Sequence, residues 1–589
     1  MRNICTEAFV AAAKAKVDWL RAACAVALAL TLGNTAAAAA TVSQLSAVAH
    51  GGQVFLTWKE AETAAGTTFN VYVAGEPIHD VAQARRVGHH VERHSARDWW
   101  ADPASFDQKK PHGEAVGYLL HGGRRLDPTG GLFVHTVEES LQGKLFFAVT
   151  QSDARGVEDT RLTPGGNTLA RGVAATPGAL EPIWQRGGHP AAAGAGKHKP
   201  LRLELHAKGG VVANMEYLLF GDASMGWREG LPLEFSVRVE RDAVVVRPTD
   251  RVWINRPHLE AGDGGMPAIW TCWYGYNSKI YDREQMATGV PSNYTERRNL
   301  WILAWVRDYY QVDPAQWSCA GSSMGGCGTV SFGLHHPELF AALFANVPIV
   351  CYTYLGRGSA HRLEPCCWVG PIAAELKTDE GISLLGRMDS TKFVRESQAD
   401  LSPLYLVNGR QDGSIPWENN PAFYRALNDA HQGFAVYWDN GTHSTCGHDA
   451  PADVKAWQQR IHDFRRDQSF PAFSNTSSNR NAGDGRPNDG DTIGWMNRGM
   501  DWKDVGDEPG RYAITLLADY PGIAYPVRTD VTLRRVQRFK IHGAERLVAR
   551  VGDAPARPVT ADAAGRLTIP GVVISSAAGT RLVVGRAAE

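Results

Sequence analysis

A serine flanked by glycines is the feature of this chain that most directly suggests chemistry. Gly321, Ser323 and Gly325 form a Gly-x-Ser-x-Gly pattern. Small neighbours let the backbone turn sharply from a strand into a helix and keep the serine Oγ exposed as a nucleophile. Residues 316–320 predict a short apolar strand before the turn, and residues 328–334 predict a buried helix after it. Strand, turn and helix are the context that this chemistry requires, so Ser323 is the candidate nucleophile.

A serine nucleophile also needs a general base, and the base needs a carboxylate that orients it. For this type of turn the expected chain order is serine, aspartate, histidine. Asp412 stands just past a strand predicted over 402–408, and His443 follows a strand predicted over 434–438. Parallel sheets collect their functional groups beyond the carboxyl ends of the strands. We therefore predict that Asp412 and His443 meet Ser323 at one sheet edge.

Three other residues compete for these roles. His448 lies farther from the strand end than His443, and Asp389 follows no clear strand. Asp439 precedes the histidine within the same strand end and would have difficulty reaching the imidazole. Taken singly, Asp412 could be a turn former, since Asp-Gly is a common turn dipeptide, and His443 a surface histidine. Three groups in the right order, each after a strand, favour the catalytic interpretation.

An acyl-transfer site also needs hydrogen-bond donors for the oxyanion. The backbone N–H of Met324, the residue after the nucleophile, is the expected first donor. The second should come from a loop after an earlier strand. Residues 273–277 follow a strand predicted over 268–273, and the donor there could be Gly275, Tyr276 or another residue. The alternative for this segment is a plain turn that ends a strand.

Substrate contacts are harder to assign. The long segment of about 351–400 is a candidate lid over the site, and it contains Trp368. Trp417, just after Asp412, could line a pocket for an aromatic or sugar ring, although a buried core tryptophan is an equal alternative. No feature of the sequence identifies an acyl group.

Overall composition excludes some classes of function. The chain has 589 residues, with 61 Lys plus Arg against 62 Asp plus Glu. This balance gives no support for nucleic-acid binding, which usually shows a basic excess. The length is too great for one core and predicts several domains. No CxxC or HExxH motif is present, so we expect no metal and no cofactor.

The N-terminus predicts export. Basic residues precede a short apolar run at 22–32, and small residues follow at 36–40. This order is typical of a secretory signal peptide over 1–40, which predicts a secreted or periplasmic protein. The apolar run is short for a membrane span, and we expect none elsewhere. Removing the peptide leaves an odd number of cysteines, whose pairing the sequence does not assign.

The pattern of apolar residues divides the remaining chain into regions. Short alternating strands over 41–175, with turns between them, predict a β-sandwich. Alternating strands and helices over 200–466 predict a doubly wound, mostly parallel sheet covered on both faces. A polar run at 474–491 predicts a linker, and residues 492–589 predict a C-terminal β-sandwich. We therefore expect an α/β catalytic domain flanked by two β-sandwich domains.

Several of these stretches resemble known families. Val-Asp-Pro at 312–314, Gly-Ser-Ser-Met-Gly-Gly at 321–326, Asn-Gly-Arg-Gln-Asp at 408–412 and Gly-Thr-His at 441–443 resemble the α/β-hydrolase superfamily. Within it, they resemble secreted feruloyl esterases, polyhydroxybutyrate depolymerases and prolyl-oligopeptidase-like hydrolases. The resemblance implies that Ser323 is the nucleophile, His443 the base and Asp412 the orienting acid.

The N-terminal part resembles a fibronectin type III domain. The resemblance rests on Leu-x-Trp at 56–58, Val-Tyr-Val at 71–73 and Phe-x-Val at 147–149. The position of the family's corner tyrosine holds Phe147. A long insertion, roughly 82–131, separates the strands, so the domain would be an elaborated one.

These observations predict a secreted serine hydrolase that cleaves acyl or phenolic esters of plant polysaccharide through an acyl-enzyme. One alternative is a polyester (polyhydroxyalkanoate) depolymerase. Another is a prolyl-oligopeptidase-like peptidase, although the N-terminal part lacks the internal repeat of a propeller. A third is a carbohydrate-binding protein with a retired hydrolase domain. The expected partner is a small or polymeric ester, with the oligomeric state left open.

Overall fold

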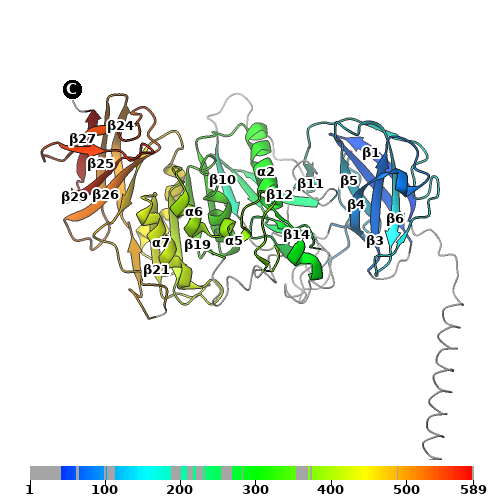
Figure 1. Ribbon diagram of the computed structural model, residues 1–589, viewed down its shortest axis with the longest axis horizontal. Helices are drawn as coiled ribbons and strands as arrows, with labels where there is room; N and C mark the ends of the chain where they lie inside the picture. Colours follow the sequence, from blue (N-terminus) through cyan, green and yellow to red (C-terminus); the bar gives the residue numbers. More distant parts are fainter. Residues whose placement is uncertain are drawn as a thin grey trace, which may run out of the picture.

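A computed structural model gives the arrangement of the chain. It describes residues 42–61, 66–98, 101, 113–186, 201–207, 217–220, 230, 232–253, 268–280, 283–352, 369–371, 374–486 and 488–586. The predicted signal peptide and Trp368 lie outside the described residues. The described chain forms three parts in a row: an N-terminal β part, a central α/β part and a C-terminal β part (Figure 1).

The N-terminal part consists of two antiparallel sheets. The first has the order β1-β2-β5 and the second β4-β3-β6-β7, with β8 also paired to β6. Leu56, Val71 and Phe147 are among the fully buried residues of the core between them. The elements are β1 (Val42–His50), β2 (Gln53–Glu60), β3 (Thr68–Ala74), η1 (Val81–Gln83), β4 (Arg85–Glu92), β5 (Gly131–Thr136), β6 (Gly143–Ser152), β7 (Glu158–Asp159) and β8 (Val173–Ala175).

The central part is built on a ten-stranded sheet with the order β23-β21-β20-β19-β18-β10-β13-β12-β11-β9. The six strands from β21 to β13 in this order run parallel to their neighbours. The strands are β9 (Ile183–Trp184), β10 (Arg202–Ala207), β11 (Tyr217–Phe220), β12 (Pro232–Val239), β13 (Ala243–Pro248), β18 (Trp317–Ser322), β19 (Ala342–Asn346), β20 (Leu404–Gly409), β21 (Phe434–Asp439) and β23 (Gly494–Met496). The mostly apolar sequences of β13, β19, β20 and β21 fit a sheet that is buried on both faces.

Helices and short ribbons complete the central part. They are β14 (Arg251–Trp253), β15 (Ala268–Trp270), β16 (Tyr276–Asn277), η5 (Arg283–Thr288), β17 (Pro291–Ser292), α2 (Tyr294–Tyr310), α3 (Met324–Gly328), η6 (Thr329–Gly333), α5 (Leu384–Arg387), α6 (Ser390–Glu396), η8 (Trp417–Asn419), α7 (Asn420–Asp429), α8 (Ala452–Lys455), α9 (Trp457–Arg460) and η9 (Ile461–Asp463). Within the described residues, no helix has both the length and the apolar character needed to cross a bilayer.

Two sequence predictions for this part need correction. The strand predicted over 268–273 ends at Trp270, and β15 pairs with β14 in a ribbon of its own, outside the main sheet. The reason is a turn at 271–274 that takes the chain out of extended geometry. The buried helix predicted over 328–334 is mostly a π-helix, η6, which continues α3.

The C-terminal part is again a pair of antiparallel sheets around an apolar core. One sheet has the order β22-β26-β29 and the other β24-β25-β30-β27-β28. The strands are β22 (Phe470–Ser474), β24 (Met500–Glu508), β25 (Arg511–Ala518), β26 (Val527–Arg534), β27 (Arg546–Val551), β28 (Arg557–Thr560), β29 (Thr568–Ile574) and β30 (Thr580–Arg586).

The chain crosses between the central and C-terminal parts more than once. β22 belongs to the C-terminal part, yet β23, which follows it in the chain, pairs with β21 at the edge of the central sheet. The polar run predicted as a linker lies between these strands. The carbonyl of its last residue, Asp491, accepts hydrogen bonds from Arg410 and from the Trp438 indole. This run is therefore packed against the central part, and the predicted boundary at 492 does not coincide with the boundary between sheets.

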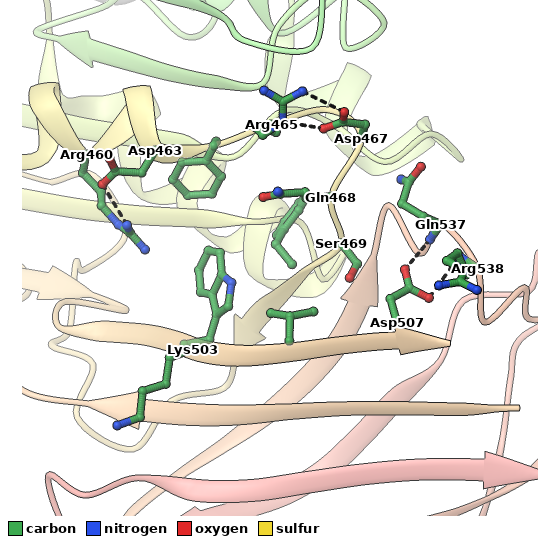
Figure 2. A pocket seen from close by; sticks show the side chains of 14 residues that line it. Arg460, Asp463, Arg465, Asp467, Gln468, Ser469, Lys503, Asp507, Gln537 and Arg538 are labelled. Carbon is green, nitrogen blue, oxygen red and sulfur yellow. Dashed lines mark hydrogen bonds and ion pairs between the residues drawn. The ribbon is translucent and has the colours of Figure 1, made fainter. Parts of the chain in front are cut away.

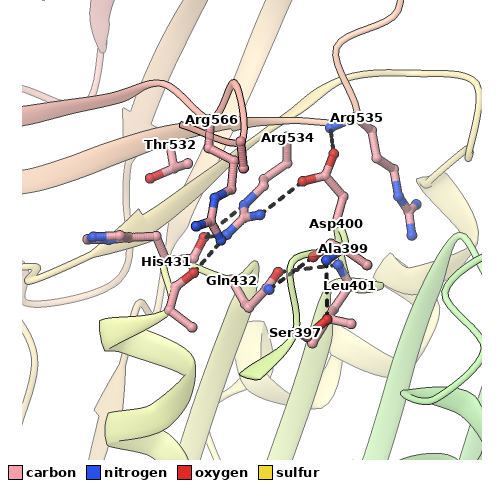
Figure 3. Close-up of polar contacts among 12 residues, drawn as sticks. Ser397, Ala399, Asp400, Leu401, His431, Gln432, Thr532, Arg534, Arg535 and Arg566 are labelled. Carbon is pink, nitrogen blue, oxygen red and sulfur yellow. Dashed lines mark hydrogen bonds and ion pairs between the residues drawn. The ribbon is translucent and has the colours of Figure 1, made fainter. Parts of the chain in front are cut away.

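Two consecutive arginines fix the C-terminal part to the central part (Figure 3). Arg534 forms an ion pair with Asp400 and donates to the carbonyls of Ala430 and His431, at the end of α7. Arg535 donates to the carbonyls of Phe340 and Ala341 and to the hydroxyl of Ser402. Both side chains are buried. The hydrogen bonds and the ion pair of these two buried arginines therefore make the contact between the two parts polar.

A cleft of about 440 Å³ lies beside this interface (Figure 2). Phe464 and Trp502 contribute apolar surface to it. The acidic groups in its wall already have protein partners: Asp463 pairs with Arg460, Asp467 with Arg465, and Asp507 accepts from backbone amides at 537–539. Ser323, Asp412 and His443 do not line it, so the cleft is separate from the predicted site.

Candidate active site

Ser323 occupies the sharp turn between β18 and α3. Its backbone has φ +57° and ψ −121°, a strained conformation for a residue with a side chain. A Cβ at Gly321 would overlap the carbonyl of Gly325, and one at Gly326 would overlap the carbonyl of Asn346. The same Asn346 carbonyl accepts a 2.9 Å hydrogen bond from the Ser323 amide. The glycines are therefore required because backbone passes directly against backbone at this turn.

The predicted serine, histidine and aspartate form one hydrogen-bonded series. Ser323 Oγ lies 2.7 Å from His443 Nε2, and His443 Nδ1 lies 2.7 Å from Asp412 Oδ2. The Asp412 side chain is 1% exposed and that of His443 is 28% exposed. The carboxylate is thus shielded from water, whereas the imidazole is partly exposed.

Local hydrogen bonds determine which oxygen of Asp412 faces the histidine. Oδ1 accepts from the backbone amides of Ser414 and Ile415, each at 2.8 Å. Oδ2 is thereby directed to His443 Nδ1. An imidazole that donates from Nδ1 carries its lone pair on Nε2, where the Ser323 hydroxyl lies. The arrangement therefore selects the tautomer that can accept the serine proton.

Adjacent strand ends bring Asp412 and His443 together. β20 and β21 run parallel side by side, and the loops that follow them remain hydrogen-bonded to each other. Arg410 N donates to the Asp439 carbonyl at 2.8 Å, and Gln411 N donates to the Gly441 carbonyl at 3.0 Å. The two loops thus leave the sheet as a pair, with the acid on one and the base on the other.

The competing residues have structural roles elsewhere. Asp439 accepts from the amides of Gly441 and Gly447 and so shapes the histidine loop. Asp389 caps the N-terminus of α6. His448 lies on the exposed far side of the same loop, where its amide donates to the Thr445 carbonyl. The structure joins none of them to Ser323 by a hydrogen bond.

A tight turn over 271–274 lies against the serine turn. Tyr274 N donates to the Thr271 carbonyl at 3.0 Å, and Cys272 and Trp273 both have positive φ, at 52° and 60°. Trp273 Nε1 donates to the Met324 carbonyl at 2.8 Å, and its ring packs where a Cβ on Gly328 would be. The turn is therefore in direct contact with α3, which begins immediately after the nucleophile.

This geometry changes the choice of second oxyanion donor. Met324 begins α3, and the first amide of a helix has no acceptor within that helix. The Gly275 amide already donates to the Thr271 carbonyl at 3.1 Å. Tyr276, in β16, pairs with Ser292 of β17. Trp273 is the turn residue that touches α3. The sequence predicted the segment 273–277 but did not single out Trp273, because two successive positive φ values on non-glycine residues leave no signal in the sequence.

The predicted substrate contacts are not supported in the described residues. Trp417 is 3% exposed, and its ring packs against Tyr424 and Trp438 with Arg410 over it. This burial contradicts a substrate-binding role for Trp417, because its ring is packed in the aromatic core and is not accessible to a substrate. Trp368 lies outside the described residues, as does all of the predicted lid segment from 353 to 368. The described end of the lid segment forms α5 and α6.

Neither Cys272 nor Cys319 provides a competing nucleophile. Cys272 is disulfide-bonded. Burial raises the pKa of the Cys319 thiol to about 12, so this residue is not a thiolate at neutral pH. Within the described residues, no group of three or more His, Cys, Asp and Glu side chains is arranged to hold a metal ion.

A family of esterases matches the part of the chain that contains this site. Residues 271–477, about a third of the chain, match the family model "Esterase", described as "Putative esterase". A comparison with curated protein sequences gave no match.

Among solved structures, an S-formylglutathione hydrolase from Agrobacterium tumefaciens is 17% identical, with 38% of this chain and 73% of that chain covered and a TM-score of 0.28. A prolyl endopeptidase is 14% identical over 72% of this chain and 53% of that chain, with a TM-score of 0.30. An acylaminoacyl peptidase from Pyrococcus horikoshii is 11% identical over 71% and 69%, with a TM-score of 0.28.

The sheet, the strained serine turn and the esterase match together support an α/β-hydrolase of the serine hydrolase class. The match begins at Thr271, the first residue of the turn beside α3, and includes Ser323, Asp412 and His443.

Proposed function

We propose that this protein is a serine carboxylesterase that acts through Ser323, His443 and Asp412. The observation that carries the proposal is the unbroken series of two 2.7 Å contacts from the serine Oγ to a shielded carboxylate. The histidine tautomer that this series selects can take the serine proton. The match to an esterase family over the same residues favours an ester over a peptide as substrate.

The reaction proceeds in two balanced steps. Ser323 Oγ attacks the ester carbonyl carbon while His443 Nε2 takes the hydroxyl proton, and the resulting imidazolium returns this proton to the leaving alcohol oxygen. Water then attacks the acyl-serine, with His443 again accepting a proton and passing it back to Ser323 as the carboxylic acid leaves. Asp412 stays ionised throughout and stabilises the imidazolium.

The oxyanion in both steps needs two donors. The backbone N–H of Met324 is the first. We assign the second to the backbone N–H of Trp273, because this residue joins the neighbouring turn to α3 through its indole. Donors of this kind stabilise the charge that develops in the transition state and are usually the largest single contribution to catalysis.

The substrate we propose is an acyl or phenolic ester of plant polysaccharide, met outside the cytoplasm after removal of residues 1–40. The basic, apolar and small-residue order of that segment supports export. The β-sandwich parts on either side of the central part suit a polymeric substrate, since they extend the molecule in both directions from the site (Figure 1).

A substrate panel tests this function. The mature protein is given p-nitrophenyl acetate, feruloylated and acetylated oligosaccharides, hydroxybutyrate oligomers and peptide anilides. We expect turnover of the sugar esters, and Ser323→Ala should abolish it without changing the thermal unfolding temperature. Faster cleavage of hydroxybutyrate oligomers would indicate a polyester depolymerase, and faster cleavage of anilides a peptidase. Turnover unchanged by Ser323→Ala would exclude the serine mechanism.

A further inference from the structure

The turn that carries Trp273 is conformationally demanding. Two consecutive residues, Cys272 and Trp273, have positive φ, and neither is a glycine. Such conformations persist only where surrounding contacts hold them in place. The disulfide of Cys272 is one such contact, and residues of α2 and α5 supply others.

The beginning of α2 holds the backbone of the turn. The Tyr274 carbonyl accepts from the amides of Thr295 at 3.0 Å and Glu296 at 3.2 Å. These amides belong to the first turn of the helix, where backbone N–H groups have no intrahelical partner. The Thr295 hydroxyl also donates to the Thr271 hydroxyl at 2.7 Å. Both ends of the turn are thus attached to one helix end.

Arg387 contacts the side chains that surround the same turn. Its Nη2 lies 2.9 and 2.8 Å from the two carboxylate oxygens of Glu296, and its guanidinium lies over the Tyr274 ring, 5.2 Å from the centroid. The side chains of Arg387 and Glu296 are 10% and 8% exposed. Tyr274 is therefore bound through its carbonyl by the Glu296 backbone and covered on its ring by the arginine that the Glu296 side chain fixes.

The charge of Glu296 is maintained although the group is buried. Burial by itself would raise the pKa of this carboxyl, but the hydrogen bond from His336 and the charge of Arg387 hold the pKa below its ordinary value. His336 Nε2 lies 2.7 Å from Glu296 Oε1. Glu296 is thus an anion in contact with both Arg387 and His336, and Arg387 comes from the segment that precedes the Asp412 strand.

We propose that Arg387 and Glu296 are positioning residues for the oxyanion donor. They act on Trp273 through Tyr274, and they connect α5, α2 and the turn into one rigid unit beside Ser323. The inference rests on the proposed function for its catalytic consequence. Its mechanical part, that the ion pair holds the turn, is independent of the substrate.

The variant Arg387→Met tests the proposal because it keeps an unbranched, flexible side chain and removes the charge and the donors of the guanidinium. Arg498→Met is a matched control. Arg498 also lies near two carboxylate oxygens, those of Asp453, at 2.7 and 2.8 Å, and its guanidinium also covers aromatic rings, at Trp495 and Tyr520. Both variants lose the same kind of contact, but only one borders the turn.

Three measurements are made on the mature protein. Steady-state kinetics on p-nitrophenyl acetate should show kcat about 10-fold lower in Arg387→Met with KM changed less than about 2-fold, because the oxyanion contact forms only in the transition state. The inhibition constant of a trifluoromethyl ketone, which forms a tetrahedral adduct, should rise by the factor by which kcat/KM falls. Amide hydrogen exchange at Tyr274 and Gly275 should accelerate.

The outcomes separate the two proposals. Arg387→Lys, which keeps the charge but not the planar fork, should restore part of kcat. Exchange at Tyr274 and Gly275 that stays at the wild-type rate in Arg387→Met, or kinetic losses shared equally by Arg498→Met, would overturn the positioning role. A wild-type protein whose Ser323 is not labelled by a fluorophosphonate would instead reject the proposed function, and the exchange result would still decide whether Arg387 holds the turn.

Discussion

The indole Nε1 of Trp273 donates a 2.8 Å hydrogen bond to the carbonyl of Met324. This bond joins two segments that are about fifty residues apart in the chain and that each supply a proposed oxyanion donor. The distance between the two donors is therefore determined by a side chain, and substituting that side chain should affect catalysis more than folding.

Trp273→Phe should keep most of the ring packing on Gly328 and lose the bond to Met324. We expect kcat to fall about 10-fold, less than the loss of a donor itself, because the donor is displaced and not removed. Stopped-flow measurement of acylation gives the value. Trp438→Phe is the comparison, since it loses an indole bond of the same length to the Asp491 carbonyl. An equal loss of kcat in both would argue against a special role for Trp273.

Asp412→Asn should place an amide where the carboxylate faces His443 and favour the wrong imidazole tautomer. The expected decrease in kcat at neutral pH is on the order of 10³- to 10⁴-fold, with the fold retained. Initial rates across pH check this. Asp439→Asn, which alters an aspartate that accepts from the amides of Gly441 and Gly447 and contacts the Cys446 thiol, should lose less than about 10-fold. Similar losses in the two variants would return Asp439 to the list of candidates.

Gly321→Ala should disrupt the serine turn, because its Cβ would overlap the Gly325 carbonyl. We expect a loss of stability of about 1–3 kcal/mol and a large loss of fluorophosphonate labelling. Gly413→Ala serves as control, since a Cβ there meets nothing within 4 Å. Differential scanning calorimetry with labelling of the same samples makes the comparison. Normal labelling of Gly321→Ala would mean that the turn adapts.

Arg535→Met should remove the buried guanidinium donors from the carbonyls of Phe340 and Ala341, although Phe340 keeps the hydrogen bond from the Ser402 hydroxyl. The expected cost is about 1–3 kcal/mol for the lost hydrogen bonds. Urea unfolding followed by tryptophan fluorescence should show the C-terminal part separating at lower denaturant than the central part. Arg528→Met, at an exposed position on β26, should leave the transition unchanged. A wild-type transition in Arg535→Met would show that the interface does not depend on this side chain.

Glu234 should make stability depend on pH. Burial raises the pKa of this carboxyl well above its ordinary value, and the charge of Asp98 raises it further. A raised folded-state pKa stabilises the fold fully below the unfolded pKa of about 4.3, and this contribution is lost as pH rises toward the folded pKa. Thermal unfolding of Glu234→Gln should therefore vary less between pH 5 and pH 8 than that of the wild type. Glu139→Gln, at an exposed site, should follow the wild type.

The extent to which the sequence predicts this structure differs between elements. Ser323, Asp412 and His443 were predictable because each follows a strand, and parallel strands bring their carboxyl ends to one edge. The turn at Trp273 was not, since its positive φ values depend on contacts with α2 and Arg387 that are distant in the chain. Trp417 could be assigned to the core only with Tyr424 and Trp438 in view, because a tryptophan near a site has the same sequence signal in either role.

The order of β22 and β23 has a consequence for how this protein can be divided. β23 covers the otherwise open edge of β21, and it is reached only after the chain has contributed β22 to the other part. A chain cut near 466 would lose that covering strand and expose unpaired backbone, which favours aggregation. The central and C-terminal parts therefore cannot be exchanged as independent domains. Gene fusions or domain swaps in this protein would have to transfer the central and C-terminal parts together as one unit.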